Sequence, residues 1–369
     1  MPASTLTRGV SIEGLEVAAY KIPTDFPEAD GTYAWKATTL VTVHVRAGGR
    51  VGFGYSYADT ATATLISDLL ASAAAGRDAL DIPGVWRALV EAIRNLGRPG
   101  VSSMAIAAVD TALWDLKAKL LDLPLCLLLG RARDEVPIYG SGGFTSYPVE
   151  RLQAQLGGWA RQGIPRVKLK IGTHPEQDVA RVRAAREAVG PQTELYVDAN
   201  GAYTRTQALA QAARFADLGV VWFEEPVSSD DLDGLRFIRD RAPTGMAIAA
   251  GEYGYDQWYF RRMLDAGAVD TLQADATRCA GFTGFLRAAT LADAYGIPLS
   301  AHCAPALHLH ACMAVARLSP IEYFHDHVRI ARLLFDGVPE PVGGALRPDL
   351  SRPGIGLELK QADAARYAV

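Results

Sequence analysis

Three carboxylates stand at the ends of three consecutive apolar segments in the middle of the chain. The segments are ELYVDAN, VVWFEEP and MAIAAGE, and their carboxylates are Asp198, Glu224 and Glu252. If the segments are neighbouring parallel strands, the three side chains converge at one edge. Carboxylates so close raise one another's pKa, and a hard divalent cation relieves the repulsion. Because oxygen-only ligation favours Mg²⁺ or Mn²⁺ over zinc, the pattern indicates a magnesium site.

Two lysines in the preceding apolar segment provide a candidate base. Lys168 and Lys170 alternate by two, so they share one face of a strand. Neighbouring ammonium groups destabilise each other's charge, and a nearby metal cation adds to this effect. We therefore expect Lys170 to be neutral often enough near neutral pH to accept a proton.

A second base is indicated by Asp275 and His302, which end two neighbouring segments further along the chain. There the carboxylate can orient the imidazole and raise its basicity. The site then has a base on each side of a metal ion. This arrangement suits removal of the proton next to a carboxylate, because a fixed cation stabilises the charge that grows on the oxygens of the ene-diolate.

The elements that position these residues repeat from about residue 136. Apolar runs begin at 136, 167, 194, 220, 246, 271, 298 and 321, each followed by a helical stretch, with successive starts 23 to 31 residues apart. Such repeats are typical of a closed barrel of parallel strands. An open doubly wound sheet is the alternative, but GSGGFTS at 140–146 does not fit its glycine-rich nucleotide turn. We therefore expect an α/β fold with a barrel.

Most runs end in a residue that is costly to bury, and all strand ends of a parallel barrel open onto one face. In chain order these residues are Ser141, Lys168, Lys170, Asp198, Asn200, Glu224, Glu225, Glu252, Asp275, His302 and Glu322. Their convergence, rather than any single residue, predicts a catalytic site.

The chain outside the repeat has a different pattern. Strands are predicted at 13–22 and 38–57, with a hairpin turn at 47–50, and helices at 60–76, 83–97 and 101–121. The tail, 337–369, carries no further repeat, so we expect it to leave the barrel and pack elsewhere.

Composition limits the partners. A net charge of −4 over 369 residues gives no general attraction for nucleic acid or anionic lipid. No run approaches the roughly 18 apolar residues of a membrane span, and residues 1–14 lack the apolar stretch of a secretory signal. The cysteines show no C-x-x-C spacing, so we interpret them as thiols. We expect a cytoplasmic protein that binds neither nucleic acid nor membranes.

With these residues in view, the chain resembles the enolase superfamily and, within it, the mandelate racemase subgroup. Segments 105–130 and 195–226 are similar to its N-terminal and metal-binding fingerprints, and the two lysines with the Asp275/His302 pair assign the subgroup. The resemblance implies a modified (β/α)7β barrel at 134–336. It also implies an α+β capping domain at 1–133 that is completed by the tail.

The resemblance also implies a role for each convergent residue. Asp198, Glu224 and Glu252 would bind Mg²⁺, while Lys170 and His302 would be acid/base catalysts on opposite faces of a small carboxylate substrate.

Other residues would assist them. Asp275 would orient His302, Lys168 would tune Lys170 and neutralise the substrate carboxylate, and Glu322 would hydrogen-bond that carboxylate or its enolate. Asn200 and Ser141 match less distinctive substrate-contact positions.

Substrate choice would lie with the capping segments, namely the predicted loop at 23–36 and residues 54–57. Their candidate substrate-binding residues are Tyr33, Trp35 and Tyr57, although for Tyr33, Trp35 and Asp30 loop packing is the alternative.

Several further polar residues have a structural interpretation. We expect Glu225 to form a salt bridge with the barrel wall and Cys303 to be a buried thiol rather than a nucleophile. We expect structural roles for His308 and His310, and either a structural role or a place at the site rim for His325 and His327.

Two bases around one metal permit two reactions. We favour dehydration of an acid sugar, an aldonate or aldarate, over racemisation or epimerisation of an α-substituted acid. A binding or assembly role without turnover is the third alternative. Barrels of this kind generally form symmetric homo-oligomers, which we also expect here.

Overall fold

The computed structural model describes residues 9–369 and contains the barrel that the repeat predicts. Residues 1–8, part of the stretch inspected for a signal sequence, lie outside the described residues. Eight parallel strands follow in chain order: β4 (Val136–Gly142), β5 (Arg166–Lys170), β6 (Glu194–Asp198), β7 (Val220–Glu224), β8 (Ala247–Ala250), β9 (Thr271–Ala274), β10 (Leu299–Ala301) and β11 (Ile321–Phe324). Because β11 pairs with β4, the sheet curls back on itself. On the other side of β11, a bridge between Leu299 and Leu318 joins β10 to the segment before it.

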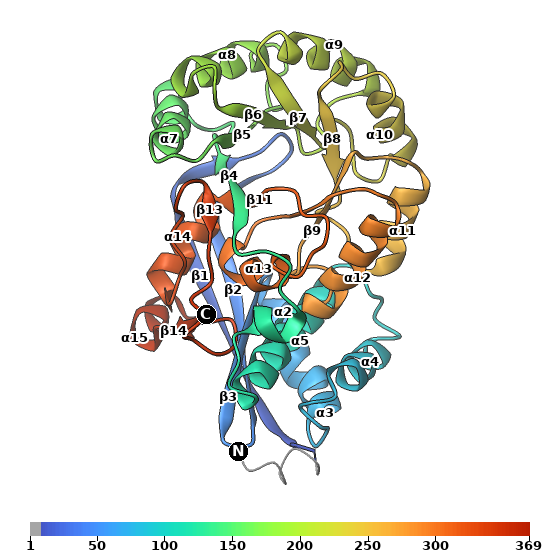
Figure 1. Ribbon diagram of the computed structural model, residues 1–369, viewed down its shortest axis with the longest axis vertical. Helices are drawn as coiled ribbons and strands as arrows, with labels where there is room; N and C mark the ends of the chain where they lie inside the picture. The colour runs from blue at the N-terminus through green and yellow to red at the C-terminus, as the bar shows by residue number, and fades with distance from the viewer. Residues whose placement is uncertain (1–8) are drawn as a thin grey trace.

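Helices cover the outside of the barrel, and α7 to α12 follow one another around the strands in Figure 1. They are α7 (Val149–Arg161), α8 (Asp178–Val189), α9 (Arg205–Ala216), α10 (Leu232–Arg239), α11 (Gln257–Asp265), α12 (Gly281–Ala294), α13 (Pro305–Cys312) and α14 (His325–Leu334). Within the described residues, no helix combines the length and apolar character needed to span a bilayer.

Strand alternation decides which side chains enter the barrel. On β5, Val167 and Leu169 join the apolar core shared with the helices, so Lys168 and Lys170 point inward. In the parallel register Lys170 lies opposite Asp198, and Asp198 lies opposite Glu224. The three charged residues therefore form one layer at the carboxyl ends of the strands. An aromatic cluster that includes Tyr139, Tyr196 and Trp222 fills the layer below.

The N-terminal region is an antiparallel sheet with helices on one side, drawn below the barrel in Figure 1. Its strands are β1 (Ile12–Ala29), β2 (Ala34–Ala47) and β3 (Arg50–Tyr57), and its helices are α2 (Thr60–Leu65), a π-helical turn (Ile66–Leu70), α3 (Ala71–Ala74), α4 (Ile82–Ala92), α5 (Val101–Leu120) and α6 (Leu125–Leu129). The predicted hairpin is confirmed, since Gly48 and Gly49 join β2 to β3 with φ of 56° and 71°.

The prediction of a loop at 23–36 is wrong for most of its length. β1 extends to Ala29 and β2 begins at Ala34, so the segment is a long hairpin with a short tip. A register shift between Pro23 and Glu28 marks a bulge, which hides the period-two pattern of a strand in the sequence.

The tail returns to the N-terminal region, after first contacting the barrel. Strand β12 (Phe335–Asp336) directly precedes the tail, whose own elements are β13 (Ala345–Leu346), β14 (Glu358–Leu359), α15 (Gln361–Ala364) and a 3₁₀ turn (Ala365–Tyr367). β13 pairs with barrel strand β4, which corrects the expectation that the whole tail leaves the barrel. The Val369 N–H then donates to the Ala19 carbonyl at 3.1 Å. The boundaries at 133/134 and 336/337 stay a prediction.

Helix α5 packs unusually close to β3 because two glycines of that strand face it. A Cβ built on Gly54 would lie 2.4 Å from the Ala112 nitrogen, and one on Gly52 would lie 2.2 Å from the Ala112 carbonyl oxygen. Both atoms belong to the helix backbone, which cannot move aside as a flexible side chain would. The glycines therefore fix how closely the helix approaches the sheet.

We expect Gly54→Ala to destabilise the fold by about 1 to 3 kcal/mol, because the added methyl group must push α5 away from the sheet. Gly14→Ala on β1 is the matched control, since its Cβ meets no heavy atom within 4 Å. The free energies of unfolding of both variants can be measured by chemical denaturation. Equal stability of the two variants would contradict the close approach.

Candidate functional site

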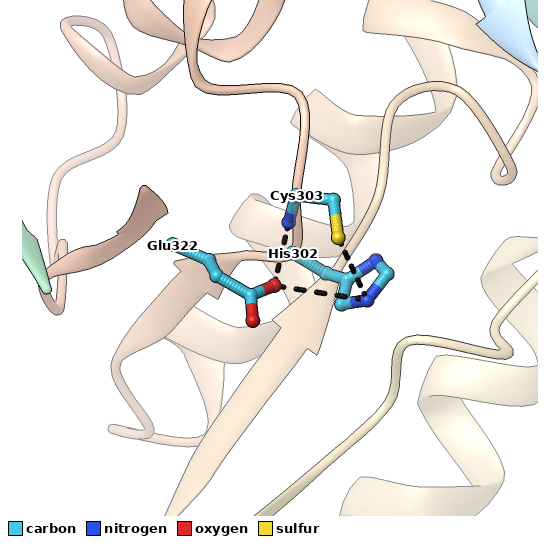
Figure 2. A group of neighbouring side chains, drawn as sticks. All are labelled: His302, Cys303 and Glu322. Atoms are coloured by element: carbon cyan, nitrogen blue, oxygen red, sulfur yellow. Dashed lines mark hydrogen bonds and ion pairs between the residues drawn. The ribbon is translucent and has the colours of Figure 1, made fainter. Parts of the chain in front are cut away.

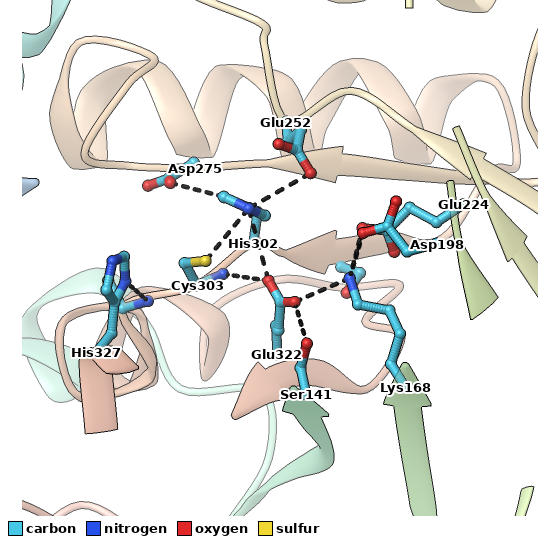
Figure 3. Close-up of polar contacts among 12 residues, drawn as sticks. Ser141, Lys168, Asp198, Glu224, Glu252, Asp275, His302, Cys303, Glu322 and His327 are labelled. Atoms are coloured by element: carbon cyan, nitrogen blue, oxygen red, sulfur yellow. Dashed lines mark hydrogen bonds and ion pairs between the residues drawn. The ribbon is translucent and has the colours of Figure 1, made fainter. Parts of the chain in front are cut away.

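The structure brings the three predicted metal ligands together. Asp198 and Glu224 end β6 and β7, and Glu252 lies two residues after β8. Each offers a carboxylate oxygen, and these oxygens lie within 4.8 Å of one another. All three side chains are buried, and Figure 3 shows them grouped at the strand ends. This is the convergence that the sequence predicts.

Two lysines neutralise much of this negative charge. Lys168 Nζ lies 2.5 Å from Glu224 Oε1, 2.8 Å from Glu322 Oε1 and 3.3 Å from Asp198 Oδ2. Lys170 Nζ donates to Asp198 Oδ2 at 2.5 Å. Because both ammonium groups are buried, these ion pairs are needed to offset the loss of water around each charge.

The neutral state expected for Lys170 beside a metal ion stays a prediction, because Asp198 pairs here with the lysine itself. Burial is the largest single influence and lowers the pKa of Lys170, but the charges of Asp198 and the other nearby carboxylates together raise the pKa overall. Repulsion between the two lysines is a smaller effect. The pKa of Lys170 therefore depends on what else Asp198 binds. Burial, with the charge of Asp198, raises the pKa of Glu224, as expected for crowded carboxylates.

A histidine and an aspartate form the second predicted base. His302 Nδ1 lies 2.9 Å from Asp275 Oδ2, and Asp275 Oδ1 accepts the Thr277 N–H at 2.7 Å. Burial raises the pKa of Asp275, but its hydrogen bond to His302 and the charge of that ring outweigh burial and lower it. The ionised carboxylate fixes the ring, so that Nε2 faces Glu252 Oε2 at 3.4 Å.

Glu322 joins the two halves of the site. Its Oε1 accepts from Ser141 Oγ at 2.6 Å and pairs with Lys168, while Oε2 accepts the Cys303 N–H at 2.8 Å and lies 3.7 Å from His302 Nε2. Figure 2 shows Glu322 reaching towards both the ring and the backbone of the next residue. Burial is the largest single influence and raises the pKa of Glu322, but Lys168, His302 and Lys170 together outweigh burial and lower the pKa.

Backbone strain accompanies the strand ends. Asn200 after β6, Glu225 after β7, and Cys303 and Ala304 after β10 all have φ between 38° and 51°, a region that side chains other than glycine rarely adopt. Such strain persists only where the surrounding contacts enforce it, and it is concentrated at functional sites. Here it turns the chain sharply as soon as each site residue has been placed.

A cavity of about 420 Å³ opens above this cluster, between the barrel and the N-terminal region. Its lining from the barrel includes Lys170, Asn200, Glu252, Tyr253, Asp275, Thr277, Arg278, His302, Cys303, Phe324 and His327. Its lining from the N-terminal region is Asp30, Tyr33, Trp35, Ala37, Thr38, Thr39, Tyr57, Ala58 and Asp59. Both candidate bases therefore face one chamber.

Most of the candidate substrate-binding residues line the cavity, but one does not. Asn200, Tyr33, Trp35 and Tyr57 line the cavity, whereas Ser141 lies beneath it, bound to Glu322. Asp30, for which loop packing is the alternative interpretation, has both roles. It lines the cavity, and it also packs the loop, because its Oδ1 accepts the Thr32 and Tyr33 N–H groups.

Of the structural roles expected for Glu225 and Cys303, the first is wrong and the second is confirmed. Glu225 forms no salt bridge among the described residues, and its buried Oε1 has no hydrogen-bond partner there, so the prediction of a wall salt bridge is wrong. The strained backbone at Glu225 turns its side chain off the regular strand direction. Cys303 is a buried thiol whose pKa is raised by burial, as expected, although its Sγ lies 3.2 Å from His302 Nε2.

Of the four remaining candidate histidines, three lie away from the cavity and one lines it. His308 and His310 are structural, since His308 Nε2 accepts the Ala276 N–H at 2.8 Å and His310 Nδ1 accepts the Cys126 N–H at 3.2 Å. His325 lies outside the cavity lining and pairs with Asp25. His327 does line the cavity, with its ring stacked on Tyr57 at 3.5 Å between centroids.

Arg278 is the site residue that sequence reasoning missed. Its Nη1 donates to both the carbonyl oxygen (3.1 Å) and Oε1 (3.2 Å) of Glu252, and its Nε lies 3.9 Å from Asp275 Oδ2. Glu252 Oε2 remains without a hydrogen-bond partner among the described residues. Arg278 thus holds Glu252 in one orientation. Its position three residues after Asp275, just beyond a strand end, was the available signal.

These residues fit a magnesium ion. The donor set consists of three buried carboxylates, the ligands that Mg²⁺ prefers. Glu252 Oε2, which accepts no hydrogen bond among the described residues, is an acceptor available to a cation. Asn200 Oδ1 is a second buried oxygen without a partner beside them.

Comparison with known proteins agrees with this geometry. Residues 16–130 match the N-terminal domain family of mandelate racemase and muconate lactonizing enzyme, and residues 151–364 match the enolase C-terminal domain-like family. This chain belongs to the mandelate racemase/muconate lactonizing enzyme family. The resemblance stated from the sequence is therefore confirmed.

Members of this family with assigned activities are similar over most of the chain. D-galactarolactone cycloisomerase of Agrobacterium fabrum is 32% identical, covering 93% of this chain and 94% of the relative. L-talarate/galactarate dehydratase of Salmonella typhimurium is 32% identical, and the match covers 85% of this chain and 78% of the relative. Arabinonate dehydratase of Saccharolobus solfataricus is 30% identical, and the match covers 86% of this chain and 87% of the relative.

Solved structures from this family superpose closely. A mandelate racemase/muconate lactonizing enzyme-like protein from Rubrobacter xylanophilus has a TM-score of 0.95 at 57% identity, covering 97% of this chain and all of that chain. A Streptomyces coelicolor racemase with bound magnesium has a TM-score of 0.91 at 32% identity, with the same coverage.

In this protein, the buried carboxyl group of Glu28 on the long β1/β2 hairpin is expected to stay protonated near neutral pH. Glu28 is 1% exposed, and its Oε2 accepts the Trp35 Nε1–H at 2.9 Å. Burial, reinforced by the charge of Asp326, raises the pKa of Glu28 to about 9. A protonated Glu28 thus supports the Trp35 wall of the cavity.

We expect Arg278→Gln to weaken Mg²⁺ or Mn²⁺ binding about 10- to 100-fold, because Glu252 loses the group that orients it. Manganese binding followed by electron paramagnetic resonance, without substrate, measures this directly. Arg261→Gln, at an exposed arginine of α11, is the control and should bind the metal normally. Unchanged or tighter binding in Arg278→Gln would show that the arginine only repels the cation.

We expect Glu28→Gln to flatten the pH dependence of stability. The pKa of Glu28 is higher in the folded than in the unfolded state, so its stabilising contribution is complete below about pH 4.5 and is lost as pH rises through about 9. Glutamine keeps an acceptor for Trp35 and cannot ionise. Melting temperatures between pH 6 and 9.5 should fall less in the variant than in the wild type; parallel curves would refute the burial argument.

Proposed function

We propose that this chain removes the proton next to the carboxylate of an acid sugar and expels the β-hydroxyl as water, with Mg²⁺ as cofactor. The observation that carries the proposal is the pair of bases. Lys170 and His302 face one cavity from either side of the three-carboxylate cluster, and each is held by its own aspartate. A reaction that needs proton transfer at two positions suits this pair.

In this proposal Asp198, Glu224 and Glu252 hold the metal ion. Bound there, Mg²⁺ supplies positive charge that stabilises the substrate carboxylate and the charge that grows on its oxygens. Arg278 keeps Glu252 oriented towards the cluster. Asn200, with its unpaired oxygen at the cavity wall, is positioned to bind substrate.

The proton transfers belong to Lys170 and His302. With Asp198 engaged by the cation, the ion pair that raises the pKa of Lys170 would be weakened, and Lys170 as the neutral amine would take the α proton. The electron pair of the broken C–H bond moves into the carboxylate. When that pair returns to form the C=C bond, the C–O bond to the β-hydroxyl breaks. His302 Nε2 gives the departing oxygen its proton, and water leaves. Asp275 stabilises the imidazolium before this transfer, as its lowered pKa indicates.

Two further residues balance charge around the reaction. Lys168 is fully buried and pairs with both Glu224 and Glu322, so it neutralises the cluster without lining the cavity. Glu322 lies between Lys168 and His302 and fixes the Cys303 backbone, which holds the histidine loop in place. Its proposed contact with the substrate carboxylate rests on this central position.

The names of the relatives support this reaction class. Two are dehydratases, of L-talarate/galactarate and of arabinonate, and the third is a cycloisomerase of D-galactarolactone. All are named for acid sugars or their lactones. Racemisation or epimerisation is the second candidate, because a base on each side of the site could also return a proton to the opposite face of the same carbon. A symmetric homo-oligomer in the cytoplasm remains part of the prediction.

The test is incubation with a panel of acid sugars in deuterated water and Mg²⁺, followed by proton NMR. We expect water loss to a 2-keto-3-deoxy acid. We also expect His302→Asn to slow it by about 10²- to 10⁴-fold through loss of the general acid. His325→Asn, outside the cavity, is the matched control and should keep the wild-type rate.

The alternatives give different results in the same experiment. Incorporation of α-deuterium with inversion and no loss of water would identify a racemase or epimerase. Absence of any exchange, in protein shown to bind magnesium, would favour a binding role without turnover.

A further inference from the structure

The proposed function leaves open whether the substrate carries one carboxylate or two. The charges around the cavity bear on this question. Among the described lining residues, the cations other than imidazoles are Lys170 and Arg278. Lys170 is paired with Asp198, and Arg278 is paired with Glu252. Both cations belong to the end of the cavity where the carboxylate cluster lies.

The wall from the N-terminal region carries the opposite charge. Its ionisable residues include Asp30 and Asp59. Oδ1 of Asp30 holds the hairpin tip, and Oδ1 of Asp59 accepts the Ala61 N–H at the start of α2. No hydrogen bond within the described residues uses either Oδ2. Asp30, which is half-buried, and Asp59, which is exposed, therefore each keep an acceptor oxygen at the cavity wall.

Apart from neutral hydroxyl groups, His327 is the lining residue of this end on which a second carboxylate could rely for positive charge. Its Nδ1 accepts the Ala304 N–H at 3.2 Å, and its ring stacks on Tyr57. Burial lowers the pKa of His327 to about 3, in agreement with the acceptor role of Nδ1. The ring therefore offers an Nε2–H donor but no positive charge.

From these contacts we propose that the substrate is a monocarboxylic polyhydroxy acid, an aldonate, whose far end is uncharged. Hydroxyl groups donate to the free oxygens of Asp30 and Asp59, whereas a second carboxylate has no hydrogen to donate and repels both. Beside Asp30, which is partly buried, it would also lose water without gaining a cation. The rings of Trp35 and Tyr57 suit the C–H faces of an uncharged chain.

This inference rests on the proposed function and sharpens it. The test compares stereochemically matched pairs of five- and six-carbon aldonates and aldarates, each with Mg²⁺, by kcat/KM. We expect at least one aldonate to exceed its aldarate partner about tenfold or more, because like charges in contact strongly disfavour the wrong ligand. Kd values of the same pairs, measured calorimetrically with Lys170→Ala, should follow the same order.

One variant tests the electrostatic cause. Asp59→Asn removes the charge but keeps an oxygen that caps α2, since asparagine caps helices about as well as aspartate. We expect the aldonate-to-aldarate ratio of kcat/KM to fall about threefold or more, and to fall most at low ionic strength. Asp68→Asn makes the same charge change at an exposed position outside the cavity lining and should leave the ratio unchanged.

The failures of the two proposals are distinguishable. Turnover of aldarates as fast as, or faster than, aldonates would overturn the inference while leaving the dehydratase proposal intact. A ratio that Asp59→Asn does not alter would also overturn it, because the preference would then have another cause. No reaction and no magnesium-dependent binding with either acid class would overturn the proposed function and this inference together.

Discussion

The requirement that buried charges be paired governs this structure. The strand ends bring Asp198, Glu224, Glu252 and Glu322 into a space from which most water is excluded, and Lys168 and Lys170 enter the same space from β5. Either set alone would be costly to bury, so each depends on the other. Lys168 is central because it touches three of the four carboxylates at once. A divalent cation among these ligands would change the balance of every neighbouring charge.

The barrel and the N-terminal region contribute differently to the site. The strand register sets the layer that contains Lys170, Asp198 and Glu224, and an aromatic layer beneath supports it. Charged chemistry is thus placed on the most rigid part of the molecule. The N-terminal region supplies aromatic rings, hydroxyl groups and two aspartates to the opposite wall, and Trp35 and Asp30 among them belong to the long hairpin of β1 and β2. Its packing depends on Glu28, a carboxyl that burial keeps protonated.

Arg278 and Glu322 show how the two candidate bases and the proposed metal ligands are connected. Arg278 contacts Glu252 and approaches Asp275, so one guanidinium lies between a proposed metal ligand and the aspartate that pairs with His302. Glu322 makes the corresponding link between Lys168 and the backbone beside His302. The strained residues Cys303 and Ala304 are held by such contacts. The site is therefore one coupled network, in which substitutions at neighbouring positions should not be additive.

Much of this protein is encoded locally. The alternation of apolar runs and helical stretches predicted the parallel barrel, because each βα unit carries its own pattern, and the spacing of polar residues at run ends predicted which side chains would meet. Contacts between distant segments decided the rest. The pKa of Lys170 follows from its distance to Asp198, the pairing of Arg278 with Glu252 joins two loops, and the bulge in β1 hid a strand within a predicted loop. The unpaired Glu225 likewise depends on a backbone turn enforced by its surroundings. Period and residue type act over a few positions, whereas burial and charge depend on neighbours that only the folded chain brings together.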